Sequence, residues 1–371
     1  MINIITSLNH VAIFLFILRS LTGEVVFLYI GLIIGLIVFC FQFFVYKLNL
    51  LIIIYIILFI LGSLISLVND FDTYLLFLPL GISSLGIAWR IHTHGINHRL
   101  ISILFLLIFA YFIFKVIIIN SGIDSAFANS RNHISVMFIN MTVLYIISSN
   151  IIGKNYNSFP AYVTLYASYL GVGLTGIIAS LVLITMKPID FLYKKISYTI
   201  YLLLIASIFL VITFFDQVLE SISYILIFNQ DIESDYYLKF SNLSEYSSNP
   251  RFEIWSEYLS SLNLYKIIFG ISIDECFATI CNLHSAYFLL HARTGIIALA
   301  FILFFITSLI RLGISNIKLA ICLFAILLRG VGDTTFMAGS SFDFVIAYLI
   351  VFAPYSTEIQ STYKKTYNAK R

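Results

Sequence analysis

Charged residues are scarce in this chain. Only 11% of its 371 residues are Asp, Glu, Lys or Arg, whereas 61% are hydrophobic and the mean hydropathy is +1.01. Soluble domains carry roughly 25% charged residues, so this composition excludes a soluble globular protein. Apolar runs of about 20 residues recur throughout, the length of a helix that crosses a bilayer. The sequence therefore predicts an all-α polytopic membrane protein, because a transmembrane barrel would show short alternating segments instead.

Motifs of nucleotide chemistry are also missing. The chain has no Walker loop, no dinucleotide fingerprint and no nucleotide-sugar Asp-x-Asp motif, so a soluble nucleotide-fuelled activity is unsupported. The first apolar run has neither a basic start nor a small-residue cleavage site. We therefore expect the first helix to stay as an anchor rather than to be removed as a signal peptide.

Cysteine is equally scarce, with four in the chain. Cys40 and Cys322 fall in apolar runs, where we expect inert packing. Cys276 and Cys281 fall in the largest hydrophilic segment. In an oxidising compartment they would pair across a C-x4-C step, and two free thiols in a folded loop is an equally good interpretation. The spacing lacks the further ligands that zinc requires, so no metal site is predicted there.

Twelve apolar segments are predicted to cross the membrane. They lie at residues 3–18, 25–45, 49–69, 73–89, 100–119, 134–152, 160–173, 175–187, 197–215, 284–310, 318–332 and 342–355. Residues 160–187 could instead form one long helix. Loop charge favours two, because short cytoplasmic loops collect Lys and Arg. With twelve spans both termini are cytoplasmic, and 13 of the 21 basic residues lie inside, 5 outside and 3 within spans.

This topology divides the chain into four parts. Residues 1–215 hold the N-terminal spans, 216–283 form one large extracytoplasmic loop, 284–355 hold the last spans and 356–371 form a basic cytoplasmic tail. The loop has ten acids and three bases, so it suits neither nucleic acid nor anionic lipid. Apolar residues from Phe252 to Leu264 predict a short amphipathic helix at the membrane interface.

Arg251 and His284 are the leading candidates for chemistry. Arg251 opens the predicted amphipathic helix, and its planar guanidinium suits phosphate oxygens. Its alternative is a snorkelling arginine or a partner for Glu253 or Glu257. His284 stands at the outer start of the tenth span, where its ordinary pKa suits proton transfer. Its alternative is an interfacial polar residue.

Arg131 falls on the same predicted outer face, just before the sixth span. Alone it reads as an ordinary loop charge. Together with Arg251 and His284 it suits an anionic, lipid-linked substrate. His133, two residues on, is expected to pack or to point to the headgroups.

Two more arginines, Arg293 and Arg329, fall within predicted spans. Charges at such depth are costly and usually face a cavity or a partner. A substrate role and a buried ion pair with Asp333 or Asp343 are equally good interpretations.

Three histidines and two arginines gather near one predicted cytoplasmic loop: His92, His94, His98, Arg90 and Arg99. Their spacing could hold a metal. A solvated positive loop is the preferred interpretation.

The residues from Arg251 to Gly295 resemble the superfamily of O-antigen polymerases and ligases. That family has Arg-x-x-x-Trp early in a large periplasmic loop, then His followed by Ser or Asn at the start of the next span, then Tyr-Leu and a Gly. Here these are Arg251 to Trp255, His284-Ser285, Tyr287-Phe288 and Gly295. The specific match covers 45 residues, while the twelve-span layout covers the whole chain.

This chain also departs from the family pattern. Many members have Ser-Arg at the bend after the seventh span, whereas this sequence has Leu174-Thr175-Gly176, so Arg131 could substitute for the missing arginine. Members often carry Glu-Thr-Gly where this chain has Arg293-Thr294-Gly295. The ligase pattern requires Gly, Thr or Tyr three residues after Gly295, and Ala298 misses it, which favours the polymerase.

The resemblance implies a GT-C-like, metal-independent glycosyltransferase without cofactors in the bacterial inner membrane. Its substrates would be undecaprenyl-pyrophosphate-linked oligosaccharides, with membrane lipid and a chain-length regulator protein as further partners and no nucleic acid. A sugar hydroxyl would attack an anomeric carbon and release undecaprenyl pyrophosphate. Arg251 and Arg131 would stabilise the leaving group, and His284 would act as base or pyrophosphate ligand. Trp255, Tyr287 and Arg293 are expected to contact sugar or pyrophosphate, although the two aromatic rings could simply pack.

Two alternatives to a polymerase of O-antigen or capsule repeat units stay open. A ligase would transfer finished glycan from the same carrier to a lipid A core or a protein. A flippase or transporter for polyprenyl-linked saccharide is the alternative from another class. Such transporters tend to show repeated halves with broken helices meeting at mid-membrane. This sequence shows no internal repeat, and its candidate residues cluster at one predicted surface.

Overall fold

A computed structural model describes residues 2–69, 76–118, 131–171, 174–195, 250–272, 275, 277, 283–332 and 341–355. Throughout these ranges the regular structure is helical, and none of them forms a strand. The chain divides into two compact units. Unit 1 comprises Met1–Ile184, Asn263–Asp274 and His284–Arg371, and unit 2 comprises Thr185–Leu262 and Glu275–Leu283.

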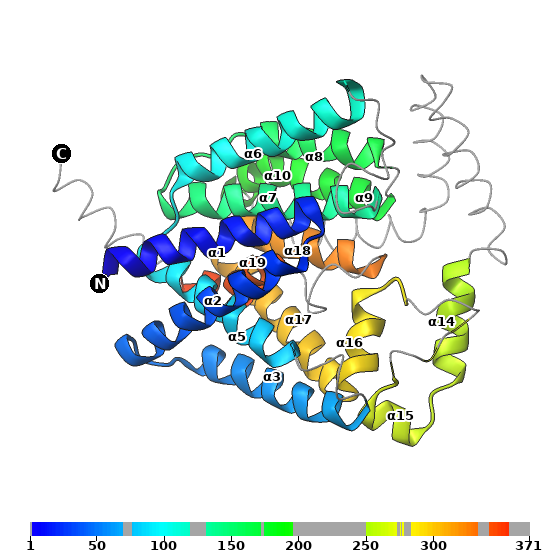
Figure 1. Cartoon of the computed structure of the whole chain (residues 1–371). Coiled ribbons are helices and arrows are strands. Elements are labelled where there is room, and N and C mark those ends of the chain that lie inside the picture. Colours follow the sequence, from blue (N-terminus) through cyan, green and yellow to red (C-terminus); the bar gives the residue numbers. More distant parts are fainter. Residues whose placement is uncertain are drawn as a thin grey trace. The chain divides into compact units, whose positions relative to one another are not determined.

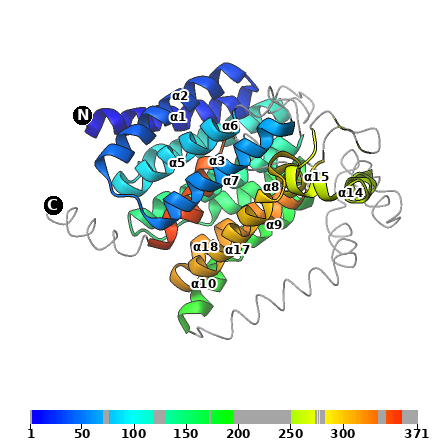
Figure 2. The ribbon, with the colours of Figure 1, turned by 90° about the horizontal axis from the view of Figure 1, so that it is seen from below.

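Unit 1 begins with three helices joined by short connections: α1 (Ile2–Thr22), α2 (Val25–Val45) and α3 (Leu50–Asn69). The first two run side by side in both ribbon views (Figures 1 and 2). α2 also packs along α5 (Phe77–His94). Their backbones approach closely where Gly86 faces α2, since a Cβ there would lie 2.7 Å from the Gly35 carbonyl oxygen. Small residues thus set the distance between these helices, as is common in membrane bundles.

The next helices are α6 (His98–Ile113), which continues into the π-helical η1 (Phe114–Ile118), and α7 (Arg131–Ile151). The start of α6 is fixed by Asn97, whose side-chain oxygen accepts from the backbone N–H groups of Arg99 (3.0 Å) and Leu100 (3.3 Å). This is the ordinary N-cap, which satisfies N–H groups that have no partner within the helix.

Residues 159–184 form two helices, as the loop charges predicted: α8 (Phe159–Leu170) and α9 (Leu174–Ile184). Ser168 and Ser180 hydrogen-bond across the pair, with their hydroxyl oxygens 3.2 Å apart. Such a bond between residues twelve apart indicates a helical hairpin whose bend lies near the start of α9.

The last part of unit 1 contains α15 (Leu264–Phe269), α16 (Ala286–Thr294), α17 (Ile297–Ser315) and α18 (Ile317–Val331). It ends with α19 (Asp343–Ala347), η3 (Tyr348–Phe352) and η4 (Ala353–Tyr355). The single span expected over 284–310 is therefore two helices. The chain breaks at Gly295, whose φ of +52° ends α16 before α17 begins.

Seven helices in the described ranges are long and apolar enough to cross a membrane. They are Asn3–Thr22, Val25–Val45, Leu50–Val68, His98–Val116, His133–Ile151, Leu174–Phe191 and Ile297–Ser315. Large apolar side chains point outward from them, as at Phe44 (85% exposed), Leu107 (60%) and Leu303 (62%). An apolar surface of this extent is costly in water and suits lipid. The chain is therefore an all-α, membrane-embedded protein.

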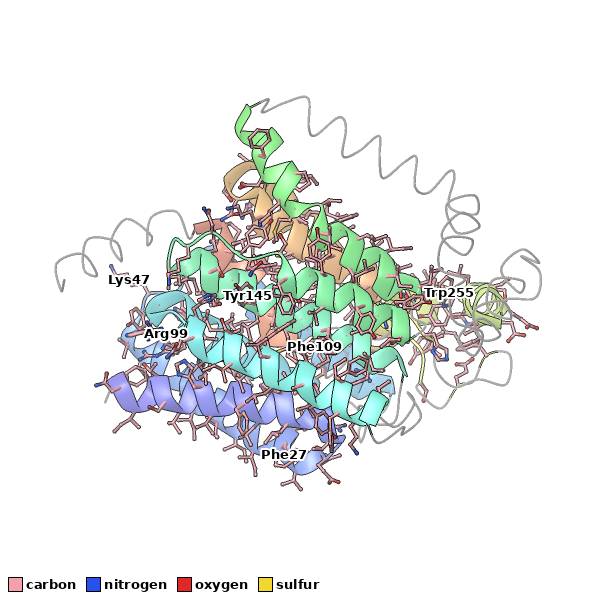
Figure 3. All side chains as sticks on the ribbon, turned by 90° about the horizontal axis from the view of Figure 1, so that it is seen from above. Phe27, Lys47, Arg99, Phe109, Tyr145 and Trp255 are labelled. Carbon is pink, nitrogen blue, oxygen red and sulfur yellow. The ribbon has the colours of Figure 1, made fainter. Side chains whose placement is uncertain are left out.

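The remaining predicted spans are not among these seven helices. Those at 73–89, 160–173, 318–332 and 342–355 coincide with shorter or less apolar helices, namely α5, α8, α18 and α19 with η3. The predicted span at 197–215, most of the loop over 216–283 and the tail over 356–371 lie outside the described residues. The number of twelve spans stays a prediction. Lys47 and Arg99, both expected to be cytoplasmic, lie at the same end of unit 1 (Figure 3).

Unit 2 is described at α10 (Met186–Lys195), α14 (Pro250–Ser260) and two short pieces that contain Glu275, Phe277 and Leu283. α14 falls where the amphipathic helix was predicted. Its buried side carries Ile254 and Tyr258, one turn apart and 0% and 1% exposed, and Tyr258 meets Phe277 edge-on at 5.3 Å. Glu253 and Glu257, each directly before one of these buried residues, are exposed.

Candidate functional site

Arg329 joins three helices of unit 1. It lies in the last turn of α18 and is only 2% exposed. Its Nε donates to Ser135 Oγ of α7 (3.0 Å), and its Nη1 donates to Thr175 Oγ1 of α9 (2.9 Å). Ser135 and Thr175 lie in the first two turns of their helices, so the starts of α7 and α9 meet the end of α18 at this arginine.

Small residues allow these helix ends to converge. A Cβ on Gly176 would lie 2.5 Å from Ser135 Cβ, and one on Gly332 would lie 2.4 Å from Thr175 Cγ2. Ser135 and Thr175 therefore pack directly against the backbone at Gly176 and Gly332, which restricts the positions of their hydroxyls around Arg329. A serine and a threonine can accept these hydrogen bonds without neutralising the guanidinium.

α16 reaches the same end of α18. The Tyr287 hydroxyl donates to the Leu327 carbonyl oxygen (2.9 Å), and Leu327 precedes Arg329 by two residues. The first turn of α16, which directly follows His284, is thus fixed beside the last turn of α18. Tyr287 was predicted to contact substrate. In the structure its hydroxyl proton is already engaged with the neighbouring helix.

His284 has an unusual backbone. Its φ is +47°, and no other non-glycine residue in the described part of the chain has a positive φ. Ser285 then returns to an extended conformation, with φ −147°, and is the last residue before α16. Left-handed conformations cost non-glycine residues roughly 1–2 kcal/mol, and they cluster at functional sites. The His284 side chain is half-exposed at this turn.

Trp255 holds the peptide that leads into His284. Within unit 2, its indole Nε1 donates to the Leu283 carbonyl oxygen (2.8 Å). The Arg-x-x-x-Trp spacing places Arg251 one helical turn before this tryptophan on α14. The side chain of Arg251 is outside the described part of the structure. Arg251 belongs to unit 2 and His284 to unit 1, so their pairing stays a prediction.

Arg293 does not lie nine residues into a span, as the sequence analysis assumed. It occupies the end of the short helix α16, before the candidate span Ile297–Ser315 begins. Its carbonyl oxygen accepts from Ser66 Oγ of α3 (2.7 Å), which ties the end of α16 to α3. The structure brings Arg293 to the end of α16 opposite to His284 and Tyr287. The two groups of residues are therefore not one cluster.

Two glycines lie where α15 contacts the end of α16. Gly295 and Gly270 have φ of +52° and +83°. The Ile271 N–H donates to the Ala292 carbonyl oxygen (2.8 Å), and the Ile296 N–H donates to that of Ile268 (3.1 Å). A Cβ on Gly295 would lie 2.0 Å from the Ile268 oxygen. This position therefore needs glycine both for its backbone angle and for the contact.

The remaining candidates are placed as follows. Arg131 is the first residue of α7, one turn before Ser135, and its side chain lies outside the described part. His133 is half-exposed in the same turn. Asp343 is 3% exposed in the first turn of α19, whereas Asp333 lies outside the described residues.

The histidine group near Arg90 is only in part the solvated loop that we expected, since Arg99 is exposed but Arg90 is not. Arg90 is fully buried, and its Nη2 donates to Thr6 Oγ1 of α1. The His92 ring stacks on Phe352 at 5.1 Å, and burial lowers the pKa of this histidine to about 4. His98 bonds Ser148 Oγ at 2.8 Å. The error arose because α5 extends to His94, beyond the span predicted over 73–89, and carries these residues into the bundle.

The described residues contain no group of three His, Cys, Asp or Glu side chains that could hold a metal. Cys322 is buried as expected, whereas Cys40 is exposed on α2, and both are free thiols. Cys276 and Cys281 lie outside the described residues, so their two readings stay open.

Two functional arrangements escaped the sequence reasoning. Arg329 was considered with acidic partners, while its hydroxyl partners Ser135 and Thr175 are 194 and 154 residues away in the chain. No local pattern carries such a contact. The hydrogen bond from Trp255 to Leu283 could not be predicted from the sequence either, although the spacing to His284 had singled out both segments.

Comparisons of this chain with protein-family models, with curated proteins and with solved structures found no match.

Proposed function

We propose that the chain is an integral-membrane glycosyltransferase of the bacterial inner membrane that polymerises saccharide repeat units carried on a polyprenyl diphosphate. The observation that carries the proposal is the position of Arg329. A buried cation in the last turn of α18, a helix that coincides with a predicted span, is held by two hydroxyls and lies beside the start of α16, the helix that follows His284. Ionisable groups at such depth usually serve a function.

Arg329 also bears on the main departure from the family pattern. The bend after the seventh predicted span lacks the arginine expected there and has Thr175 instead. The Arg329 guanidinium reaches that threonine from α18. We infer that Arg329 supplies the positive charge at this bend, a role that the sequence alone had suggested for Arg131.

The proposed reaction uses these groups as follows. A hydroxyl oxygen of one lipid-linked repeat attacks the anomeric carbon of another lipid-linked chain and forms the glycosidic bond. The bond from that carbon to the diphosphate oxygen breaks, and the polyprenyl diphosphate leaves with the electron pair. Charge grows on the diphosphate, so Arg329 stabilises the transition state more than the ground state, and the sequence resemblance predicts the same role for Arg251. His284 accepts the hydroxyl proton.

The strained backbone of His284 supports its assignment to the chemical step. A left-handed histidine is retained only where the surrounding structure holds it, and here the carbonyl of the preceding Leu283 accepts a hydrogen bond and α16 follows along the chain. Tyr287 then has a positioning role, because its hydroxyl ties α16 to α18 near Arg329.

Reconstitution tests the proposal. The purified protein in nanodiscs is supplied with a polyprenyl-diphosphate-linked oligosaccharide, and products are separated on a gel. We expect a ladder of lengthened glycans from the wild type and none from His284→Ala or Arg329→Met. Arg311→Ala is the matched control, since this arginine is exposed near the end of α17, and it should keep the ladder.

The outcomes separate the alternatives. Transfer of whole glycan to a lipid A core or a protein acceptor without lengthening would indicate a ligase. Movement of intact lipid-linked saccharide between leaflets without new bonds would indicate a transporter. A wild-type ladder unaffected by His284→Ala and Arg329→Met would contradict the site.

A further inference from the structure

Trp255 lies at the point where α14 meets the segment before His284. Its indole N–H donates to the Leu283 carbonyl oxygen at 2.8 Å, a normal length for such a bond. That carbonyl belongs to the peptide group shared by Leu283 and His284. Any rotation of this peptide plane changes the φ of His284. The hydrogen bond from the indole therefore restrains the unusual positive φ of His284.

The segment is fixed from its other side as well. After His284 and Ser285 the helix α16 begins, and Tyr287 in its first turn donates to the Leu327 carbonyl oxygen of α18. Leu283 itself is only 6% exposed. The residue before His284 is thus held by the indole within unit 2, and the helix after it is held to α18 within unit 1.

Buried side chains hold α14, the helix that carries Trp255. Ile254 and Tyr258 are buried on either side of Trp255, and Tyr258 packs against Phe277. Arg251 lies one turn before Trp255 on the same helix. A single helical turn therefore carries both the residue predicted to hold the diphosphate and the residue that restrains the peptide at His284.

We propose that Trp255 is a positioning residue that holds His284 in its left-handed conformation through the Leu283 carbonyl, rather than a sugar-stacking residue. This inference rests on the proposed function for its catalytic consequence. Its structural part, the hydrogen bond and the dihedral angle that it restrains, does not depend on any reaction.

The kinetic test uses Trp255→Phe, which keeps an aromatic ring and removes the N–H. Misplacing a catalytic group by about 1 Å costs roughly 100-fold, so loss of one restraint should lower kcat roughly 10- to 100-fold. KM should stay within about twofold, because binding is left intact. The matched control is Trp89→Phe, which removes the only other tryptophan, a buried residue of α5, and should keep kcat.

A double substitution separates positioning from general damage. In a His284→Gln background, Trp255→Phe should cause no further loss of the remaining activity, since its effect passes through His284. A raised KM with unchanged kcat would mean that Trp255 contacts the sugar, and an unchanged kcat and KM would mean that it does nothing. Either result overturns the proposal.

A second measurement needs no substrate. With two tryptophans, the ¹⁵N-labelled protein gives two indole N–H signals, and Trp89→Phe identifies the one from Trp255. We expect that proton to exchange slowly with solvent, and rapid exchange would overturn the inference. If the wild type makes no polymer while this proton is protected, the proposed function fails and the positioning contact stands.

Discussion

Replacing Gly295 by alanine should destabilise the protein through two separable effects. The backbone of Gly295 has φ +52°, which costs a residue with a Cβ about 1 kcal/mol. The added Cβ would also lie 2.0 Å from the Ile268 carbonyl oxygen and 2.9 Å from the Gly270 nitrogen. Both are backbone atoms, so no side chain can rotate away. Overpacking of this kind costs about 1–3 kcal/mol, and the total loss should be about 2–4 kcal/mol.

Gly153→Ala is the matched control. Gly153 has φ +67°, close to that of Gly295, but it is exposed after α7. Its replacement should therefore cost only the backbone part, about 1 kcal/mol. Thermal unfolding of both variants in detergent, with unfolding free energies compared at one temperature, measures the difference. Equal stability of the two variants would refute the contact argument, and a Gly295→Ala variant as stable as wild type would refute both parts.

Two further predictions concern the opposite end of unit 1. Because burial lowers the folded-state pKa of His92 to about 4 from an unfolded value of 6.5, its contribution to stability is complete above pH 6.5 and is lost as the pH falls towards 4, by about 3 kcal/mol in all. Unfolding of His92→Phe over that pH range should show a flatter profile, and an unchanged profile would contradict the assignment. Asn97→Ala should cost about 1 kcal/mol by removing the cap of α6. Asn155→Ala, in an exposed loop, should cost less in the same unfolding assay, and equal losses would count against the cap.

The helices could be predicted from the sequence because their signal is local. Apolar runs gave the positions of α1, α2 and α3 to within a few residues, and loop charge separated α8 from α9. Gly295 was noticed only as part of a motif, and the break that it makes between α16 and α17 was missed. Residues 284–310 were predicted as one span although His291, Arg293 and Thr294 interrupt the apolar residues, whereas the break depends on a backbone angle and on contact with Ile268.

The candidate site was predicted only in part, because long-range contacts define it. His284 and Trp255 were singled out by spacing, and the structure adds the bond from the indole to Leu283. Arg329 was noticed as a costly buried charge. An ion pair with Asp333 or Asp343 was one of two interpretations and stays a prediction. The structure adds hydrogen bonds from Arg329 to Ser135 and Thr175, which only helix packing brings within reach.

The central claim is most directly tested by counting products of the reconstituted wild-type protein. Each glycosidic bond formed between two lipid-linked repeats should release one polyprenyl diphosphate, so ³¹P spectra and glycan length should rise together in a ratio of one to one. Arg329→Met should abolish both signals while the protein stays folded. Lengthened glycan without released diphosphate, or full turnover by Arg329→Met, would contradict the account.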